Sequence, residues 1–162
     1  MVNKALLDFC EQLEATSLSQ AMQVHAWLVP AVQSVHILAI AALMGAVAML
    51  NLRVLGLSGA DQPLAGVAAR FRPVIWSALP VLLLSGAMLI VGEPARSLAN
   101  WIFQLKMLMV VAVVVLTLAL LRPLAANSLH WDARPGAARL LALLTLALWV
   151  GIIFAGRWIA YL

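Results

Sequence analysis

Four long apolar segments dominate this sequence, and their length restricts the chain to a membrane-spanning fold. They run from about Trp27 to Leu50, from Pro73 to Val91, from Ile102 to Leu121 and from Arg139 to Ile159. Each is close to the roughly 20 residues that an α-helix needs to cross the hydrocarbon core of a bilayer. Only 10% of the residues are charged, against about 25% in a typical soluble domain. We therefore expect an all-α, polytopic membrane protein, in which residues 23–162 form a four-transmembrane-helix bundle.

The segment before the first span, residues 1–22, has a different pattern. Its apolar residues recur at helical spacing and are separated by acids (apolar Ala5, Leu6, Phe9 and Leu13; acidic Asp8, Glu11 and Glu14). This segment is too short and too charged to cross a bilayer. We expect an amphipathic interfacial helix that lies on the membrane surface.

The distribution of Arg and Lys predicts the orientation in the membrane. One side carries six positive residues in the loops, namely Arg53, Arg70, Arg72, Arg122, Arg134 and Arg139, and the other carries Lys4, Arg96, Lys106 and Arg157. The positive-inside rule then places both termini on the non-cytoplasmic side. The net charge of +4 is dispersed rather than gathered in a basic run, so we expect no nucleic-acid partner.

Few polar side chains fall within the four spans, and none of them is acidic. The set contains Gln33, Ser34, His36, Lys106 and Arg157, with Ser77, Ser85, Thr117 and Thr145 as weaker members. Proton-driven transporters usually need an intramembrane carboxylate, so the absence of Asp and Glu from these segments argues against a pump or secondary transporter.

The alternating directions of the helices place four of these residues in one layer. His36 follows Trp27 by nine residues, which places it roughly 13 Å into the hydrocarbon. Lys106 lies about 7 Å in, measured from Trp101, and Arg157 lies at a similar depth near the end of the last span. Gln33, His36, Lys106 and Arg157 are therefore predicted to share the outer half of the bundle.

A pocket with two cations, one imidazole, one amide and no acid favours an anionic ligand, because unpaired charges are costly in a medium of low dielectric constant. Heme b matches this set. His36 would be the axial ligand, Lys106 and Arg157 would pair with the propionates, and Gln33 would orient the imidazole or contact the ligand. A quinone or another carboxylate fits less completely. Alternatively, His36 only forms a hydrogen bond between helices, and the side chains of Lys106 and Arg157 extend to the membrane–water interface.

The remaining histidines are predicted to lie away from His36. His25 would be about 16 Å from it along the helix axis, and His130 belongs to the loop on the other side of the membrane. A bis-histidine site would therefore need a second subunit, in a homo-oligomer, or the iron would have another sixth ligand. Copper is an alternative because thioethers suit Cu(I), although Met44, Met49, Met88, Met107 and Met109 form no compact series.

Five tryptophans are predicted to form interfacial belts, with Trp27, Trp101 and Trp158 at the outer side and Trp76 and Trp131 at the inner side. Trp149 lies deeper in its span, so we expect it to line the core.

The stretch "SVHILAIAALMGAVAMLNLRVLGL" resembles the first helix of small bacterial four-helix membrane proteins of unknown function. Those proteins show E-x-x-H, then G and D-L-R-L-L-G, whereas this chain has Gln33 and Asn51 in place of the two acids. The stretches "NWIFQLKMLMV" and "AGRWIAYL" are also similar to that family. The resemblance implies a bacterial cytoplasmic (inner) membrane protein. The lost Glu favours binding over proton transfer.

More distantly, the layout resembles the copper-resistance protein D family and the four-helix protoporphyrinogen oxidases. The first family implies copper handling, and the second implies heme at His36. We expect a heme b-binding protein with a redox or electron-transfer role, linked to quinone or to a membrane redox partner. A copper-handling membrane protein is one alternative. The other is a non-catalytic subunit or assembly partner of a larger membrane complex.

Overall fold

The computed structural model describes residues 4–59, 61–127 and 129–158, and within these ranges the only regular secondary structure is helical. Four helices are long and apolar enough to cross a membrane. They are α3 (Leu28–Leu55), α4 (Leu64–Gly92), α6 (Trp101–Ala126) and α7 (Pro135–Trp158). The predicted all-α membrane protein with a four-helix bundle is therefore confirmed.

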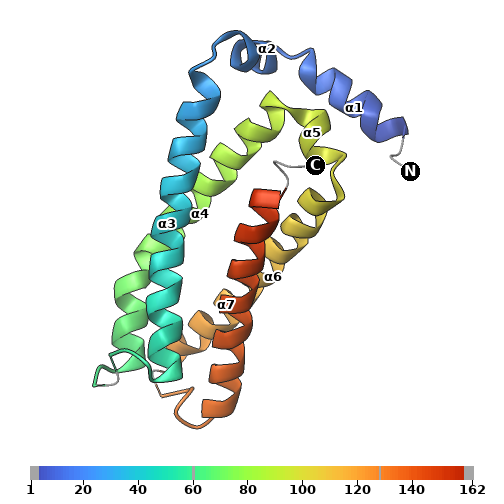
Figure 1. Cartoon of the computed structure of the whole chain (residues 1–162). Helices are drawn as coiled ribbons and strands as arrows, with labels where there is room; N and C mark the ends of the chain where they lie inside the picture. The colour runs from blue at the N-terminus through green and yellow to red at the C-terminus, as the bar shows by residue number, and fades with distance from the viewer. Residues whose placement is uncertain (1–3, 60, 128, 159–162) are drawn as a thin grey trace.

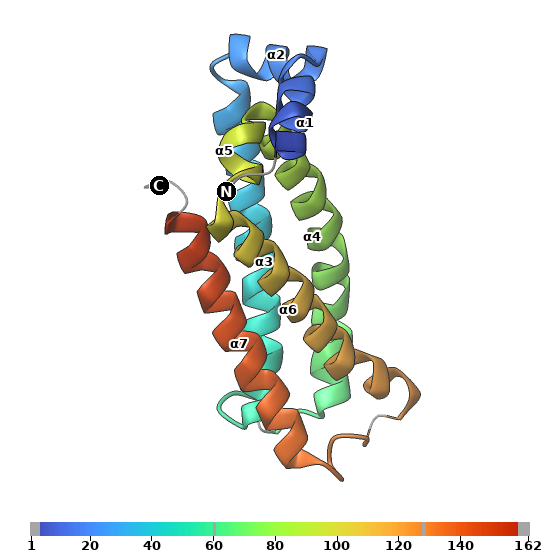
Figure 2. The same ribbon diagram turned by 90° about the vertical axis from the view of Figure 1, so that its right-hand side faces the viewer.

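The long helices pack mainly as two antiparallel pairs (Figures 1 and 2). Helix α3 lies along α4, α6 lies along α7, and α3 also packs against α7, whereas α4 and α6 touch only sparsely. The α3–α4 and α6–α7 connections lie at one end of the bundle. The starts of α3 and α6 and the ends of α4 and α7 lie at the other. We call this second end the outer end, because it carries the residues predicted to share the outer layer.

Two helices extend beyond the limits that hydropathy indicates. Helix α4 begins at Leu64, well before Pro73, and α6 continues past Pro123 to Ala126, so both prolines lie inside helices. The predicted spans, which begin at Pro73 and end at Leu121, are therefore shorter than the helices that contain them. Hydropathy detects only the part of a helix immersed in hydrocarbon. Near Arg70, Arg72 and Arg122, water can solvate the carbonyl group that a proline leaves without a partner.

The N-terminal segment forms two helices instead of one, α1 (Lys4–Glu14) and α2 (Ser17–Val24). The break occurs at Thr16, whose side chain caps α2 by accepting a hydrogen bond from the backbone N–H of Ser19. Helix α1 packs on the short helix α5 (Pro94–Leu98), and α2 packs on α4. Both cover the outer end (Figure 1).

Buried side chains hold this N-terminal cover in place. Cys10 of α1 and Met22 of α2 are almost completely buried. The Met22 methyl group lies 3.1 Å from the point where a Cβ atom on Gly92 would stand, so the Met22 side chain would have to shift by a few tenths of an ångström to admit a side chain at Gly92. Phe9 remains half exposed. The predicted surface segment thus packs on the bundle through one face and leaves apolar area on another.

Trp131 does not belong to the inner aromatic belt. Its side chain is buried, and its indole N–H donates a 2.9 Å hydrogen bond to the Leu120 carbonyl oxygen of α6. Burial and this bond instead anchor the α6–α7 loop to the bundle. Trp149 is buried in the hydrophobic core, as its depth in the sequence predicts. The other four tryptophans, Trp27, Trp76, Trp101 and Trp158, are exposed on the protein surface.

Candidate functional site

The imidazole of His36 is hydrogen-bonded across the α3–α4 interface. Its Nδ1 atom lies 2.7 Å from the hydroxyl oxygen of Ser85, a buried residue of α4. The same hydroxyl oxygen lies 2.6 Å from the backbone carbonyl oxygen of Val81, one turn earlier in α4. A serine hydroxyl has one proton, and two oxygens at this separation repel each other unless that proton lies between them. The Ser85 proton is therefore donated to Val81.

This assignment determines the tautomer of His36. Because the Ser85 oxygen can only accept from the ring, the proton of the neutral imidazole is on Nδ1, and Nε2 carries an unshared electron pair. A histidine that ligates a metal through Nε2 usually donates its other ring N–H to a neighbouring oxygen in the same way. His36 as a whole is partly exposed, so the core does not fully enclose this residue.

A glycine next to Ser85 leaves room for the ring. A Cβ atom on Gly86 would stand 3.5 Å from Cε1 of His36, which is an ordinary van der Waals contact. An alanine therefore fits here, while branches beyond Cβ would compete with the imidazole for space. Ser85 thus forms the hydrogen bond with the His36 imidazole, and Gly86 leaves space beside its ring.

Lys106 connects the other helix pair to the same layer. Its side chain projects from α6 onto α7, where Nζ lies 3.5 Å from the Cβ position of Gly156. Its ammonium group is also close enough to act electrostatically on His36. The His36–Ser85 pair of α3 and α4 and the Lys106–Gly156 contact of α6 and α7 both lie in the outer half of the bundle.

The other two predicted site residues take different positions. Arg157 directly follows Gly156 in the last turn of α7, and its side chain is exposed. Gln33 is exposed on α3, and no described residue forms a hydrogen bond with its side chain. Gln33 therefore does not orient the imidazole. Ser85 has that position because it faces α3 from the neighbouring helix, whereas Gln33 points away from the interface.

Among the described residues, no carboxylate pairs with Lys106. In the described ranges, the only ion pair between side chains joins Arg96 to Glu93, at 3.0 Å, and both are exposed. The same ranges contain no cluster of three or more His, Cys, Asp or Glu residues that could hold a metal ion. The site thus offers one imidazole electron pair and a partly buried ammonium group, which suits an anionic ligand that brings most of its own metal ligands.

Comparison with known families shows which family this chain belongs to. Residues 15–162 match the family described as "Family of unknown function (DUF6644)". The chain belongs to this family. The DUF6644 match spans α2 to α7, with His36, Ser85, Lys106 and Arg157 inside it, and leaves α1 outside. No curated protein and no solved structure matches the chain.

The other histidines of this DUF6644 chain lie away from the site. His25 is exposed and caps the end of α2. His130 stacks edge-on against Trp131, with ring centroids 4.8 Å apart, in the loop that joins α6 to α7 at the opposite end. Among the described residues, His36 is thus the only histidine of the outer layer.

Ser85 is the residue whose role sequence reasoning missed. It was grouped with the weaker polar residues, since a lone Ser in an apolar helix usually bonds back to its own carbonyl groups. Ser85 does form that bond, and it also accepts from another helix. The only local signal was the small-residue patch Ser85-Gly86-Ala87, which allows close helix approach.

Proposed function

We propose that this protein binds heme b and takes part in electron transfer in the membrane. The observation that carries the proposal is the position of the Ser85 hydroxyl oxygen, 2.7 Å from His36 Nδ1 and 2.6 Å from the Val81 carbonyl oxygen, because this arrangement favours a proton on Nδ1 and an electron pair on Nε2 that can bind iron. Heme b, when bound, supplies reversible one-electron chemistry.

The number of protein ligands favours heme over a bare metal ion. A metal held by protein alone generally needs three or four donor side chains. The described ranges contain no cluster of three or more His, Cys, Asp or Glu residues that could do so. A porphyrin supplies four nitrogen ligands itself, so the protein needs to supply only one or two axial ligands. One correctly oriented histidine is therefore sufficient for heme.

The charges of the outer layer support the same ligand. Lys106 is partly buried and acts electrostatically on His36, it has no carboxylate partner among the described residues, and Arg157 follows the glycine that Lys106 contacts. A propionate group would relieve the cost of holding the Lys106 ammonium near the hydrocarbon, and the exposed Arg157 could bind the second propionate. Lys106 and Arg157 are thus the candidates for binding propionates, with His36 as the axial ligand.

An apolar groove between α3 and α4 supports the quinone link. It borders Ser85, is lined by Ala31, Val35, Leu84 and Met88 among others, and has a volume of about 310 Å³. That volume lies within the usual range for small-molecule sites. An apolar quinone could lie in this groove, beside the hydrogen-bond partner of His36.

Absorption spectroscopy tests the proposal directly. Protein purified from heme-replete cells is expected to show a Soret band and to yield protoheme on extraction, in about one equivalent per chain or per dimer. A colourless preparation would overturn the proposal. Copper without porphyrin would instead favour the copper-handling alternative, and co-purification of a larger complex without any cofactor would favour the role of an assembly partner.

We also propose that both termini lie on the non-cytoplasmic side of a bacterial inner membrane, which makes the outer end periplasmic. Cysteine labelling checks this orientation in a Cys10→Ala background. Arg96→Cys, at the outer end, is expected to react with an impermeant maleimide in intact cells. Asp132→Cys, in the α6–α7 loop, should react only after permeabilisation. Both positions are exposed, so accessibility within the fold does not bias the comparison. The reverse labelling pattern would invert the topology.

A further inference from the structure

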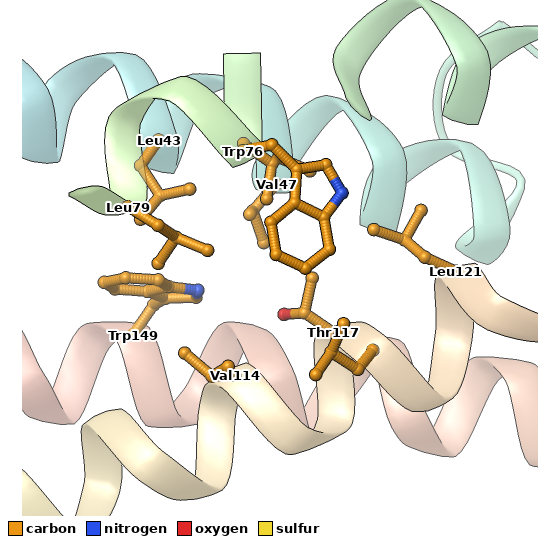
Figure 3. A pocket seen from close by; sticks show the side chains of 10 residues that line it. Leu43, Val47, Trp76, Leu79, Val114, Thr117, Leu121 and Trp149 are labelled. Carbon is orange, nitrogen blue, oxygen red and sulfur yellow. The ribbon is translucent and has the colours of Figure 1, made fainter. Parts of the chain in front are cut away.

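A small cavity lies deeper in the bundle than the His36 layer. Ten side chains from α3, α4, α6 and α7 line it, among them Trp76, Thr117 and Trp149 (Figure 3). Leu43 and Val47 form its α3 wall and follow His36 by about two and three helical turns. The cavity is therefore separate from the site proposed for heme.

One polar group that lines this cavity has no hydrogen-bond partner among the described residues. The side chain of Trp149 is only 5% exposed, and its indole N–H finds no acceptor among the described residues. An indole nitrogen can only donate, and leaving a buried donor unpaired costs free energy. Buried N–H groups in folded proteins are normally bonded to protein or to ordered water. We therefore expect the indole N–H of Trp149 to donate a hydrogen bond to an acceptor inside the cavity.

The hydroxyl group of Thr117 supplies a complementary partner. Thr117 is buried in α6, and its hydroxyl donates a 2.8 Å hydrogen bond to the Val113 carbonyl oxygen. The Thr117 oxygen therefore keeps an electron pair that can accept a hydrogen bond. Figure 3 shows the nitrogen-bearing edge of Trp149 and the oxygen of Thr117 both directed into the cavity.

The size of the cavity limits what can fill it. The centre of a water molecule can occupy about 20 Å³ of this space. A single water needs roughly 10–15 Å³ by this measure, together with two or more polar partners. The cavity therefore admits one water and is too small for an aromatic or quinone ring.

We propose that this cavity binds one ordered water molecule, which accepts a hydrogen bond from Trp149 Nε1–H and donates one to the Thr117 oxygen. The water links α6 to α7 inside the bundle, where the surrounding lining is otherwise apolar. It satisfies the Trp149 donor without any change in the protein fold. This inference is independent of heme binding.

Magnetic resonance of the full-length protein in detergent, with ¹⁵N-labelled tryptophan, tests this site. The six tryptophans give six indole N–H signals, and Trp149→Phe identifies the one from Trp149. The Trp149 signal is expected to show a cross-peak to a long-lived water. The Trp131 indole is the internal control, because it is also buried but is bonded to the Leu120 carbonyl oxygen. It should show no such cross-peak.

Two substitutions at Thr117 separate bound water from simple solvent leakage. Thr117→Ser keeps the hydroxyl and is expected to keep the water cross-peak. Thr117→Val keeps the shape and removes the acceptor, so the Trp149 cross-peak should fall at least several-fold while the Trp131 signal stays in place. A wild-type Trp149 signal without a water cross-peak would overturn the inference. So would a cross-peak of equal strength in Thr117→Val.

Discussion

His36→Ala is expected to abolish the Soret absorbance of the purified protein, because it removes the imidazole that would bind the iron. The variant should still fold, since His36 is partly exposed and, among the described residues, its imidazole forms a hydrogen bond only with Ser85. His25→Ala is the matched control. His25 is exposed at the end of α2, and its loss should leave the spectrum unchanged.

Ser85→Ala distinguishes an oriented ligand from a histidine that only packs between helices. It leaves the imidazole in place but removes the oxygen that accepts from Nδ1–H. Loss of such a supporting hydrogen bond typically lowers metal affinity about 10- to 100-fold. Heme titration of the variant should therefore show weakened binding and a shifted Soret maximum, with unchanged helix content. Unaltered binding in Ser85→Ala, or a Soret band retained in His36→Ala, would contradict the assigned roles.

Asn51→Leu is expected to stabilise the protein, which is unusual for a substitution in a core. Asn51 of α3 is completely buried, and neither its amide oxygen nor its amide nitrogen has a partner among the described residues. Each unsatisfied buried group costs about 1–3 kcal/mol, and leucine has a similar shape without that cost. We expect a gain of about 1–3 kcal/mol in the free energy of unfolding, measured by thermal or denaturant unfolding in detergent.

Asn127→Leu is the matched control, because the same substitution at this position should lower the free energy of unfolding instead of raising it. The Asn127 side chain is exposed and accepts a 2.9 Å hydrogen bond from the backbone N–H of Leu129, so its loss should cost about 1 kcal/mol. Asn51→Asp, in contrast, buries an unpaired charge and should destabilise by several kcal/mol. If Asn51→Leu instead destabilised the protein, the Asn51 amide would have a partner outside the chain, such as a second copy.

The outer layer shows how far sequence reasoning extends toward a site. The depths of His36 and Lys106 in the membrane follow from residue counts along helices of known rise. That both lie in the same half of the bundle follows from the alternating directions of the helices. His36 lies near the start of α3 and Lys106 near the start of α6, and both helices start at the outer end. Counting along a helix cannot give the direction in which a side chain points about the axis. The sequence therefore offers Gln33 either to orient the imidazole or to contact the ligand, whereas the structure pairs the imidazole with Ser85.

Trp131 and Asn51 illustrate the same difference. Trp131 lies near a predicted helix end, where interfacial tryptophans are common, yet the return of the α6–α7 loop buries it against Leu120. Asn51 lies near the inner end of its span, where a polar residue would ordinarily reach water, yet neighbouring helices enclose it. In both cases the outcome depends on chain segments distant in sequence.

The sequence by itself determined the fold class, the four spans and the layer in which His36 and Lys106 lie. Each of these depends on local apolar length or on helix rise, and both can be read along a single segment. Only the tertiary structure decided the rotation of each helix about its axis. That rotation pairs His36 with Ser85, exposes Gln33, and directs Trp149 and Thr117 into one cavity. The long helices are apolar on nearly all sides, so no amphipathic pattern reveals which face turns inward, and only packing against the neighbouring helices selects it.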